Sequence, residues 1–323
     1  IDVDQHVRVQ GSPTPSTIAA YALLGNGGLG STGNHSGDID IVRSSSVQVR
    51  GGTSNFGFAQ IGQNASNTTG NLSGQIDINS GMVTLGGGTS NLAHAQIGNG
   101  GHSAVGNHSG GIEIDAFSLG LGTTSGFAQV GQGGVGADGN HSGDITIDTT
   151  DNVSLNGLDT LFSYALIGNG DEIDGDTDAG NTVTGVIDID ADGNASVEDG
   201  WIGHLLNADG MSNTGSMDLR SGGNVTLRTH INQGVYNSPD DYTILAEGTI
   251  NLRTSIQNSL ATGGGDVNLV AGWDGTTAFN AGTFAAADVT TTTLFGSAGT
   301  RLRIGNSTLP AAAGSRSGAT NAF

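Results

Sequence analysis

The sequence predicts an all-β protein: a parallel β-helix with coils of about 36 residues, each carrying three short strands. Three observations lead to this prediction. The stretch GNHSGDIDI at residues 33–41 returns in recognisable form at 70–78, 106–114, 139–147 and, as GVIDI, at 185–189. Apolar and polar residues alternate within it, as they do in a strand with one buried face. A glycine that closes an apolar segment recurs at positions 25, 62, 98, 131 and 168, with spacings of 37, 36, 33 and 37 residues.

A β-sandwich is the main alternative, because it also consists of short strands separated by turns. A sandwich does not require the same short sequence motif to recur at one fixed period. Stacked coils do, because each strand pairs with its own copy one coil away and like side chains form ladders. No coil buries its apolar face without a neighbour, so we expect the stability to be a sum of nearest-neighbour contributions.

The elements follow in order along the chain. Residues 1–20 contain one alternating strand, His6 to Gln10, and a turn at Pro13 and Pro15. Each coil then begins with an apolar strand that ends in glycine, at residues 21–25, 58–62, 94–98, 127–131 and 164–168. The second strand carries the pairs Ile39 and Ile41, Ile76 and Ile78, Ile112 and Ile114, Ile145 and Ile147, Ile187 and Ile189, and more loosely Met217 and Leu219. The third carries Val47 and Val49, Val83 and Leu85, Leu119 and Leu121, Val153 and Leu155, and Val225 and Leu227.

This pattern divides the chain into four segments. Residues 1–20 are the leading strand and turn, and residues 21–200 are regular coils with long loops. In residues 201–275 the strands at 224–228, 248–253 and 266–271 are closely spaced, which predicts tighter coils. Residues 276–323 lose the pattern and are expected to be irregular and partly mobile. The chain opens at Ile1 with neither an initiator Met nor a signal-peptide pattern, so we expect a processed chain or an interior fragment.

The composition excludes several classes of function. Thirty acidic residues against nine arginines and no lysine give a net charge of −21, which repels nucleic acids and anionic membranes. The chain has no cysteine, and therefore no disulfide or thiol chemistry. It also has no apolar run of ~18 residues that would span a bilayer.

Two polar positions recur inside the GNHSG words. His35, His108 and His141 could form a metal-binding column, but the second copy has Leu72, which favours a turn position that tolerates either residue. On this interpretation, replacing His108 by Ala should be nearly silent. The preceding asparagines predict a ladder of side-chain amides that bond from rung to rung; they are Asn34, Asn71, Asn107 and Asn140.

Acidic residues predict an outward stripe on the second strand, favoured as a solvated face; they are Asp40, Asp77, Glu113, Asp188 and Asp218. Two stretches also resemble calcium loops. Asp188, Asp190, Asp192, Gly193, Ser196 and Asp199 match the spacing of an EF-hand loop, although glycines at 185 and 200 argue against flanking helices. Asp174, Asp176 and Asp178 begin a similar stretch, but Ala179 stands where glycine is required. Calcium is therefore an alternative for both stretches, and the main expectation is no metal and no cofactor.

The sequence lacks the common motifs of catalytic sites. The sequence contains no G-x-S-x-G, no H-E-x-x-H, no phosphate loop and no cysteine nucleophile. A carbohydrate-active β-helix enzyme needs clustered acids, often with Arg or Lys, whereas here the acids recur evenly. Residues 133–138 match half of a nonapeptide calcium repeat, but a single copy has no stacked partner. We therefore expect no catalytic residues.

Several longer sequence motifs resemble those of a known family. GDIDI followed by SVQVRGG, GGIEI followed by FSLGLG, and above all GGDVNLVAGWDG at residues 264–275 resemble the filamentous-haemagglutinin-like large exoproteins of two-partner secretion. The resemblance covers residues 20–280, and the N-terminal secretion-domain words are absent. It implies a right-handed β-helix, export through an outer-membrane partner, and a stalk at the bacterial cell surface that serves adhesion, biofilm formation or toxin delivery. The implied partners are a receptor or glycan on a host or neighbouring cell, or further copies in fibres. A carbohydrate-active enzyme and a calcium-stabilised matrix or surface-layer protein remain alternatives.

Overall fold

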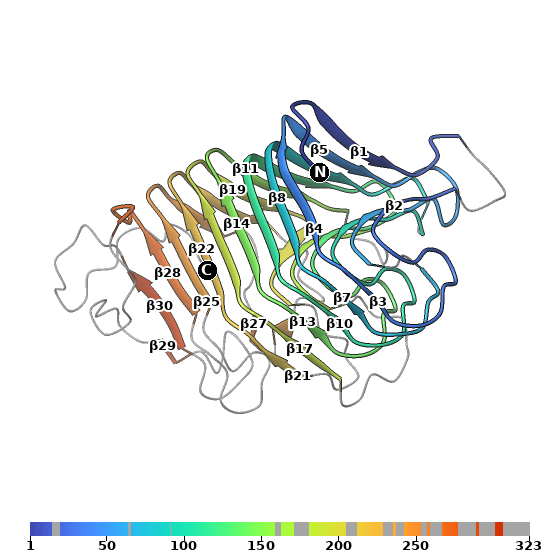
Figure 1. Cartoon of the computed structure of the whole chain (residues 1–323). Helices are drawn as coiled ribbons and strands as arrows, with labels where there is room; N and C mark the ends of the chain where they lie inside the picture. Colours follow the sequence, from blue (N-terminus) through green and yellow to red (C-terminus); the bar gives the residue numbers. More distant parts are fainter. Residues whose placement is uncertain are drawn as a thin grey trace.

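The chain folds into stacked β-coils. The computed structural model describes residues 1–14, 20–63, 66–90, 92–158, 163–170, 181–204, 212–228, 235–236, 242–252, 257–258, 267–276, 289–290 and 301–305. Within these ranges every regular element is a β-strand, and strands from successive coils lie side by side along the molecule (Figure 1). The predicted all-β parallel β-helix is therefore confirmed.

Three sheets form the sides of the coil. The long sheet has 16 strands and contains both the second and the third strand of each predicted coil. Its strands are β1 (His6–Gln10), β4 (Ile39–Ser44), β5 (Ser46–Arg50), β8 (Ile76–Gly86), β11 (Ile112–Gly122), β14 (Ile145–Thr149), β15 (Val153–Asn156), β18 (Ile187–Ala191), β19 (Ala195–Glu198), β22 (Met217–Ser221), β23 (Val225–Arg228), β25 (Tyr242–Ala246), β26 (Ile250–Leu252), β28 (Val267–Ala271), β29 (Val289–Thr290) and β30 (Arg301–Gly305).

The other two large sheets have six strands each. The second sheet contains β2 (Ala22–Leu24), β6 (Ala59–Ile61), β9 (Ala95–Ile97), β12 (Ala128–Val130), β16 (Ala165–Ile167) and β20 (Gly200–Ile202). The third sheet contains β3 (His35–Ser36), β7 (Leu72–Ser73), β10 (His108–Ser109), β13 (His141–Ser142), β17 (Thr182–Thr184) and β21 (Ser212–Thr214). A further pair joins β24 (Val235–Tyr236) to β27 (Gln257–Asn258).

The register places like residues above one another. Ile39, Ile76, Ile112, Ile145 and Ile187 are successive partners in the long sheet. They belong to one continuous buried core, to which the inward Ala and Ile or Val residues of the second sheet also belong. The predicted ladders are thus present, and each coil buries its apolar face against its neighbours.

The structure differs from the predicted coil at two corners. In β8 and β11 the second and third predicted strands join into one strand of 11 residues, which bends where the burial changes phase. Ser80 and Val83 are buried, whereas Met82 between them is exposed. The short third sheet occupies the HS positions that the sequence interpretation assigned to a turn. A strand of two residues is too short to show any periodicity, which is why the pattern did not reveal it.

The recurring glycine stands at the end of each second-sheet strand. Gly62 has φ of 146°, and a Cβ added there would lie 1.9 Å from the carbonyl oxygen of Gly98. The same close approach continues from Gly168 to Gly203, a sixth member that the sequence analysis missed. Only glycine fits this column, because each backbone passes directly over the next.

Loops cover the outer face of the second sheet. Tyr21, Phe58, His94, Phe127 and Tyr164 stack there in an aromatic ladder, with neighbouring ring centroids 4.6–5.2 Å apart. His94 takes the place of a phenyl ring and is fully buried. An imidazole in this ladder must therefore be neutral, a point that matters for the acid stability of the protein.

The spacing between strands of the long sheet shortens towards the C-terminus. Successive partners Met217, Tyr242 and Val267 in the long sheet are 25 residues apart, and β20 and β21 are the last strands of the second and third sheets among the described residues. The long sheet continues to β30, which pairs parallel with β28 and antiparallel with β29. Strand structure therefore reaches into residues 276–323, for which the sequence predicted irregular structure.

Candidate functional site: the acidic face of the long sheet

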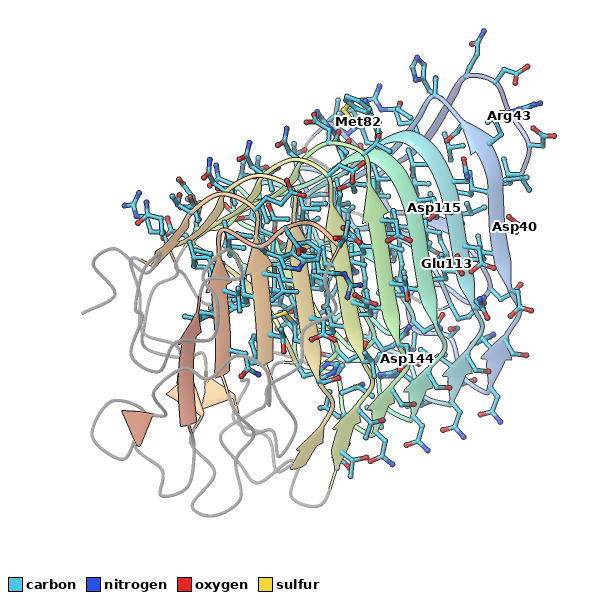
Figure 2. The ribbon with its side chains drawn as sticks, turned by 90° about the vertical axis from the view of Figure 1, so that its left-hand side faces the viewer. Asp40, Arg43, Met82, Glu113, Asp115 and Asp144 are labelled. Atoms are coloured by element: carbon cyan, nitrogen blue, oxygen red, sulfur yellow. The ribbon has the colours of Figure 1, made fainter. Side chains whose placement is uncertain are left out.

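The predicted acidic stripe forms one column on the outer face of the long sheet. In register order it contains Asp40, Asp77, Glu113, Thr146, Asp188 and Asp218. Figure 2 shows Asp40 and Glu113 on this face. The inward Ile of each strand fixes the column, since alternate residues of a strand point to opposite faces. Thr146 is the one interruption within these strands, so the stripe is confirmed with a gap in its middle.

A second column lies two residues further along each strand. It contains Asn79, Asp115, Asp148, Asp190 and Arg220. Arg220 turns to both columns: its Nη2 donates to Asp188 Oδ1, and its Nε donates to Asp190 Oδ2 at 3.3 Å. The sequence analysis missed Asp115, Asp148 and Arg220 as members of this face. The words IEID, ITID and MDLR would have indicated them, because each places a charge two residues after the stripe.

The charges of this cluster alter its protonation. Partial burial, and then the carboxylates of Asp115, Asp190 and Asp188, raise the pKa of Asp148, while Arg220 acts in the opposite direction. Burial lowers the pKa of Arg220, but hydrogen bonds and charge from Asp188 and Asp190 outweigh this and raise it above its ordinary value. The acidic cluster is therefore held together by one guanidinium group, which offsets part of the repulsion between neighbouring rungs.

The calcium-loop residues do not converge. Asp188 and Asp190 project from β18 to Arg220, while Ser196 lies on the next strand, β19. Within the described ranges no group of three or more His, Cys, Asp or Glu side chains is arranged to hold a metal ion. Asp174, Asp176 and Asp178 lie outside the described residues. In residues 133–138, Val135 and Ala137 are buried, and Asp138 accepts a hydrogen bond from Asn181, so this half-motif packs as a structural loop.

The histidine column is a buried structural feature. His108 and His141 are in register on β10 and β13, their rings stack with centroids 5.0 Å apart, and their Nδ1 atoms are 3.0 Å apart. His141 Nε2 donates to the Ala137 carbonyl, so in the neutral ring its Nδ1 accepts from His108 Nδ1. His35 is separated from this pair by Leu72. The expectation of a turn was wrong, because His108 and His141 lie in strands of the third sheet and their rings are fully buried.

Two amide ladders join successive rungs. In the predicted ladder, the backbone N–H of Asn71 donates to Asn34 Oδ1, Asn107 to Asn71, and Asn140 to Asn107, so each bond is from backbone to side chain. The sequence analysis missed a second ladder in the residue after each column glycine: Asn26, Gln63, Asn99, Gln132, Asn169 and His204. Its alternation between Asn and Gln hid it, although both side chains offer the same amide.

The fold defines the class of this protein as a parallel β-helix solenoid. Comparisons with protein-family models, curated proteins and solved structures find no match. Among the described residues there is no helix of the length and apolarity needed to cross a membrane. The functional interpretation therefore depends on the surfaces of the coil.

Proposed function

We propose that this chain is a structural β-helical shaft that is exposed on a bacterial cell surface and supports adhesion or assembles into fibres. The observation that carries the proposal is the continuous strand pairing of the long sheet, which runs from β1 to β30 with one register shift, between β4 and β8. Each rung adds roughly 4.8 Å, and like residues stack on like residues. Such a body is extended and stiff, which suits a protein that holds a binding surface away from its anchor.

The family resemblance supports the cell-surface setting. The word at residues 264–275 contributes β28 and the turn after it, where Thr276 N–H donates to Asp274 Oδ1 at 3.0 Å. In the proposed role the parent protein is secreted through an outer-membrane partner. A receptor or glycan on a neighbouring cell, or another copy of the chain, is then the partner of the shaft.

The experiment is a thermal melt with and without EDTA, with negative-stain electron microscopy of the same sample. We expect a chelator-insensitive melt, and rods or fibres in the micrographs. Compact particles without elongation would contradict the shaft. A melting temperature that falls in EDTA and returns with calcium would instead favour a calcium-stabilised matrix or surface-layer protein.

One cluster favours a second candidate, a carbohydrate-active enzyme. Asp148, Asp188 and Asp190 lie around Arg220 on the long sheet, and the raised pKa of Asp148 suits a group that donates a proton. The same sample, incubated with acidic and neutral polysaccharides, tests this candidate. Release of reducing ends by the wild type, and its loss in Asp148→Asn, would favour the enzyme over the shaft.

A further inference from the structure

A groove crosses several rungs on the outer face of the long sheet, around the C-terminal ends of β5, β8 and β11. Its volume is about 430 Å³, and Arg50, Gly86, Gly87, Thr89, Gly122 and Thr124 are among its lining residues. Gly86 and Gly122 are partners in adjacent strands, and Arg50 precedes them in the same outward column. The floor of the groove is therefore bare backbone.

These floor glycines are not required by the backbone. A Cβ added at Gly122 would meet nothing within 4 Å, and one added at Gly86 would meet only Arg50 Cγ at 3.7 Å. Neither residue has a positive φ that would strain another side chain. Gly86 and Gly122 are the last residues of β8 and β11, and without a side chain there a ligand can approach the backbone closely.

The charge of the groove is opposite to that of the protein. No acidic residue lines it, and Arg50 has no ion pair within the described part of the chain. Arg8 lies on the same outward face of the neighbouring strand β1, outside the groove lining, and it too has no ion pair among the described residues. Arg43 and Arg220, by contrast, each bind two carboxylates. In a chain of net charge −21, an unpaired guanidinium group in a groove without acidic residues favours an anionic ligand.

The other lining groups favour a saccharide over a peptide. β5, β8 and β11, which form most of the groove, are paired on both sides, so a peptide cannot extend the sheet between them. Only Gln10, the last residue of β1, lines the groove from a strand that is paired on one side among the described residues. Thr53 and Thr84 line the groove, and their buried Oγ1 atoms have no hydrogen-bond partner among the described residues. A χ1 rotation would turn each hydroxyl towards a ligand in place of its methyl group. The lining contains no aromatic side chain on which a neutral sugar could stack.

We propose that this groove binds an acidic oligosaccharide, with its carboxylates or sulfates on Arg50 and its rings over the bare strands at Gly86 and Gly122. This site deepens the proposed adhesive role and rests on it. Arg50 offers a planar fork of donors that matches a carboxylate or sulfate, and the threonine hydroxyls match sugar hydroxyls. A ligand along the groove crosses the rungs, so its affinity depends on their spacing.

Calorimetric titration with tetragalacturonate, with maltotetraose as the neutral control, tests the site. We expect the acidic tetramer to bind at low salt, to weaken as salt is added, and to bind about tenfold or more weakly in Arg50→Gln. Gly122→Val should weaken binding to a similar degree, because it fills the groove and leaves the fold intact. Ser196→Val, on the same outward face two rungs beyond Gly120, and Arg43→Gln are matched controls that should bind as the wild type does.

Absence of tetragalacturonate binding in the wild type, or unchanged affinity in Gly122→Val, would overturn the proposal. Equal binding of polyglutamate would also overturn it, since charge alone would then explain the affinity. If any of these results came with rods in the electron micrographs, the proposed shaft would stand and the binding site would not. If binding depended on Arg50 but the particles were compact, the binding site would stand and the shaft would not.

Discussion

At the scale of single residues, His108 shows how a repeated position acquires a specific environment. Its ring is fully buried, stacks on His141 and shares a hydrogen bond with it. Burial, and then the charge of His141, hold the pKa of His108 well below its ordinary value. The side chain is therefore a neutral core residue.

Replacing His108 by Ala should destabilise the protein by about 2–4 kcal/mol, because it opens a cavity and leaves His141 Nδ1 without its donor. His108→Leu should recover most of this loss, since Leu72 occupies the same column one rung away. Urea denaturation of both variants measures the free energy of unfolding. An unchanged free energy of unfolding in His108→Ala would contradict the role of His108 as a packed core residue.

At the scale of elements, each strand depends on the two rungs that cover it. In β11, Ile112 pairs with Ile76 on one side and Ile145 on the other, and all three are buried in the core. Glu113, the next residue, is exposed on the acidic face. Substitutions at Ile112 and Glu113 therefore test core packing and surface charge separately within one strand.

Ile112→Asp should unfold β8, β11 and β14 at a cost of several kcal/mol, because it places an unpaired charge between apolar rungs. Hydrogen exchange should show protection lost there first and retained longest in β25, since contributions to stability are local in a solenoid. Glu113→Gln is the matched control and should leave the exchange pattern unchanged. Uniform loss of protection along the chain would show that the molecule unfolds as one unit.

At the scale of the whole molecule, several coils of the solenoid each contain a buried histidine. Burial lowers the pKa of His94 to about 3 and that of His141 to about 4, and it also lowers the pKa values of His108 and His204. His204 accepts from Asn169 N–H through Nδ1 and binds the Gly185 carbonyl through Nε2, so its neutral form is the one that the amide ladder uses. His94 and His141 therefore remain uncharged in the folded protein at mildly acidic pH, and burial favours the neutral forms of His108 and His204 as well.

The protein should therefore lose stability as the pH falls below about 6.5. In the unfolded chain each histidine takes up a proton near its ordinary pKa of 6.5, whereas folded His141 does so only near 4. The folded state then binds fewer protons, and its stability falls by about 1.4 kcal/mol per pH unit for each such histidine. Asp148 contributes in the opposite direction, because its raised pKa lets the folded state take up a proton first. The large shifts of His94 and His141 cover most of this pH range, and the lowered pKa values of His108 and His204 act in the same direction, so melting temperatures should decrease from pH 7 to pH 4.

His94→Phe tests the source of this acid sensitivity. Phe58 and Phe127 flank His94 in the aromatic ladder, so phenylalanine continues the stack. We expect the variant to keep the wild-type fold at neutral pH and to show a shallower decrease of melting temperature in acid. An unchanged slope would assign the acid sensitivity to groups other than this ladder.

Much of this fold could be predicted from short sequence motifs. The Ile and Val pairs predicted the strands, and the glycines at 25, 62, 98, 131 and 168 predicted the period, because a repeated corner requires a repeated backbone. The acidic stripe followed as well, since the inward Ile pairs leave Asp40 and its counterparts facing outward. The third sheet was not predictable in the same way, because His108 and Ser109 show no alternation of their own.

The primary structure by itself sets the rung, its apolar face and the register between copies, because these depend on residues within one period. Only the folded coil decides which side chains meet across rungs: His108 with His141, Arg220 with Asp188 and Asp190, and Arg50 with a floor of bare glycine. The physical reason is that loops of different length separate the rungs. These loops bring residues from distant parts of the chain into one column, and the contacts across that column depend on side-chain direction and burial, which no single repeat contains.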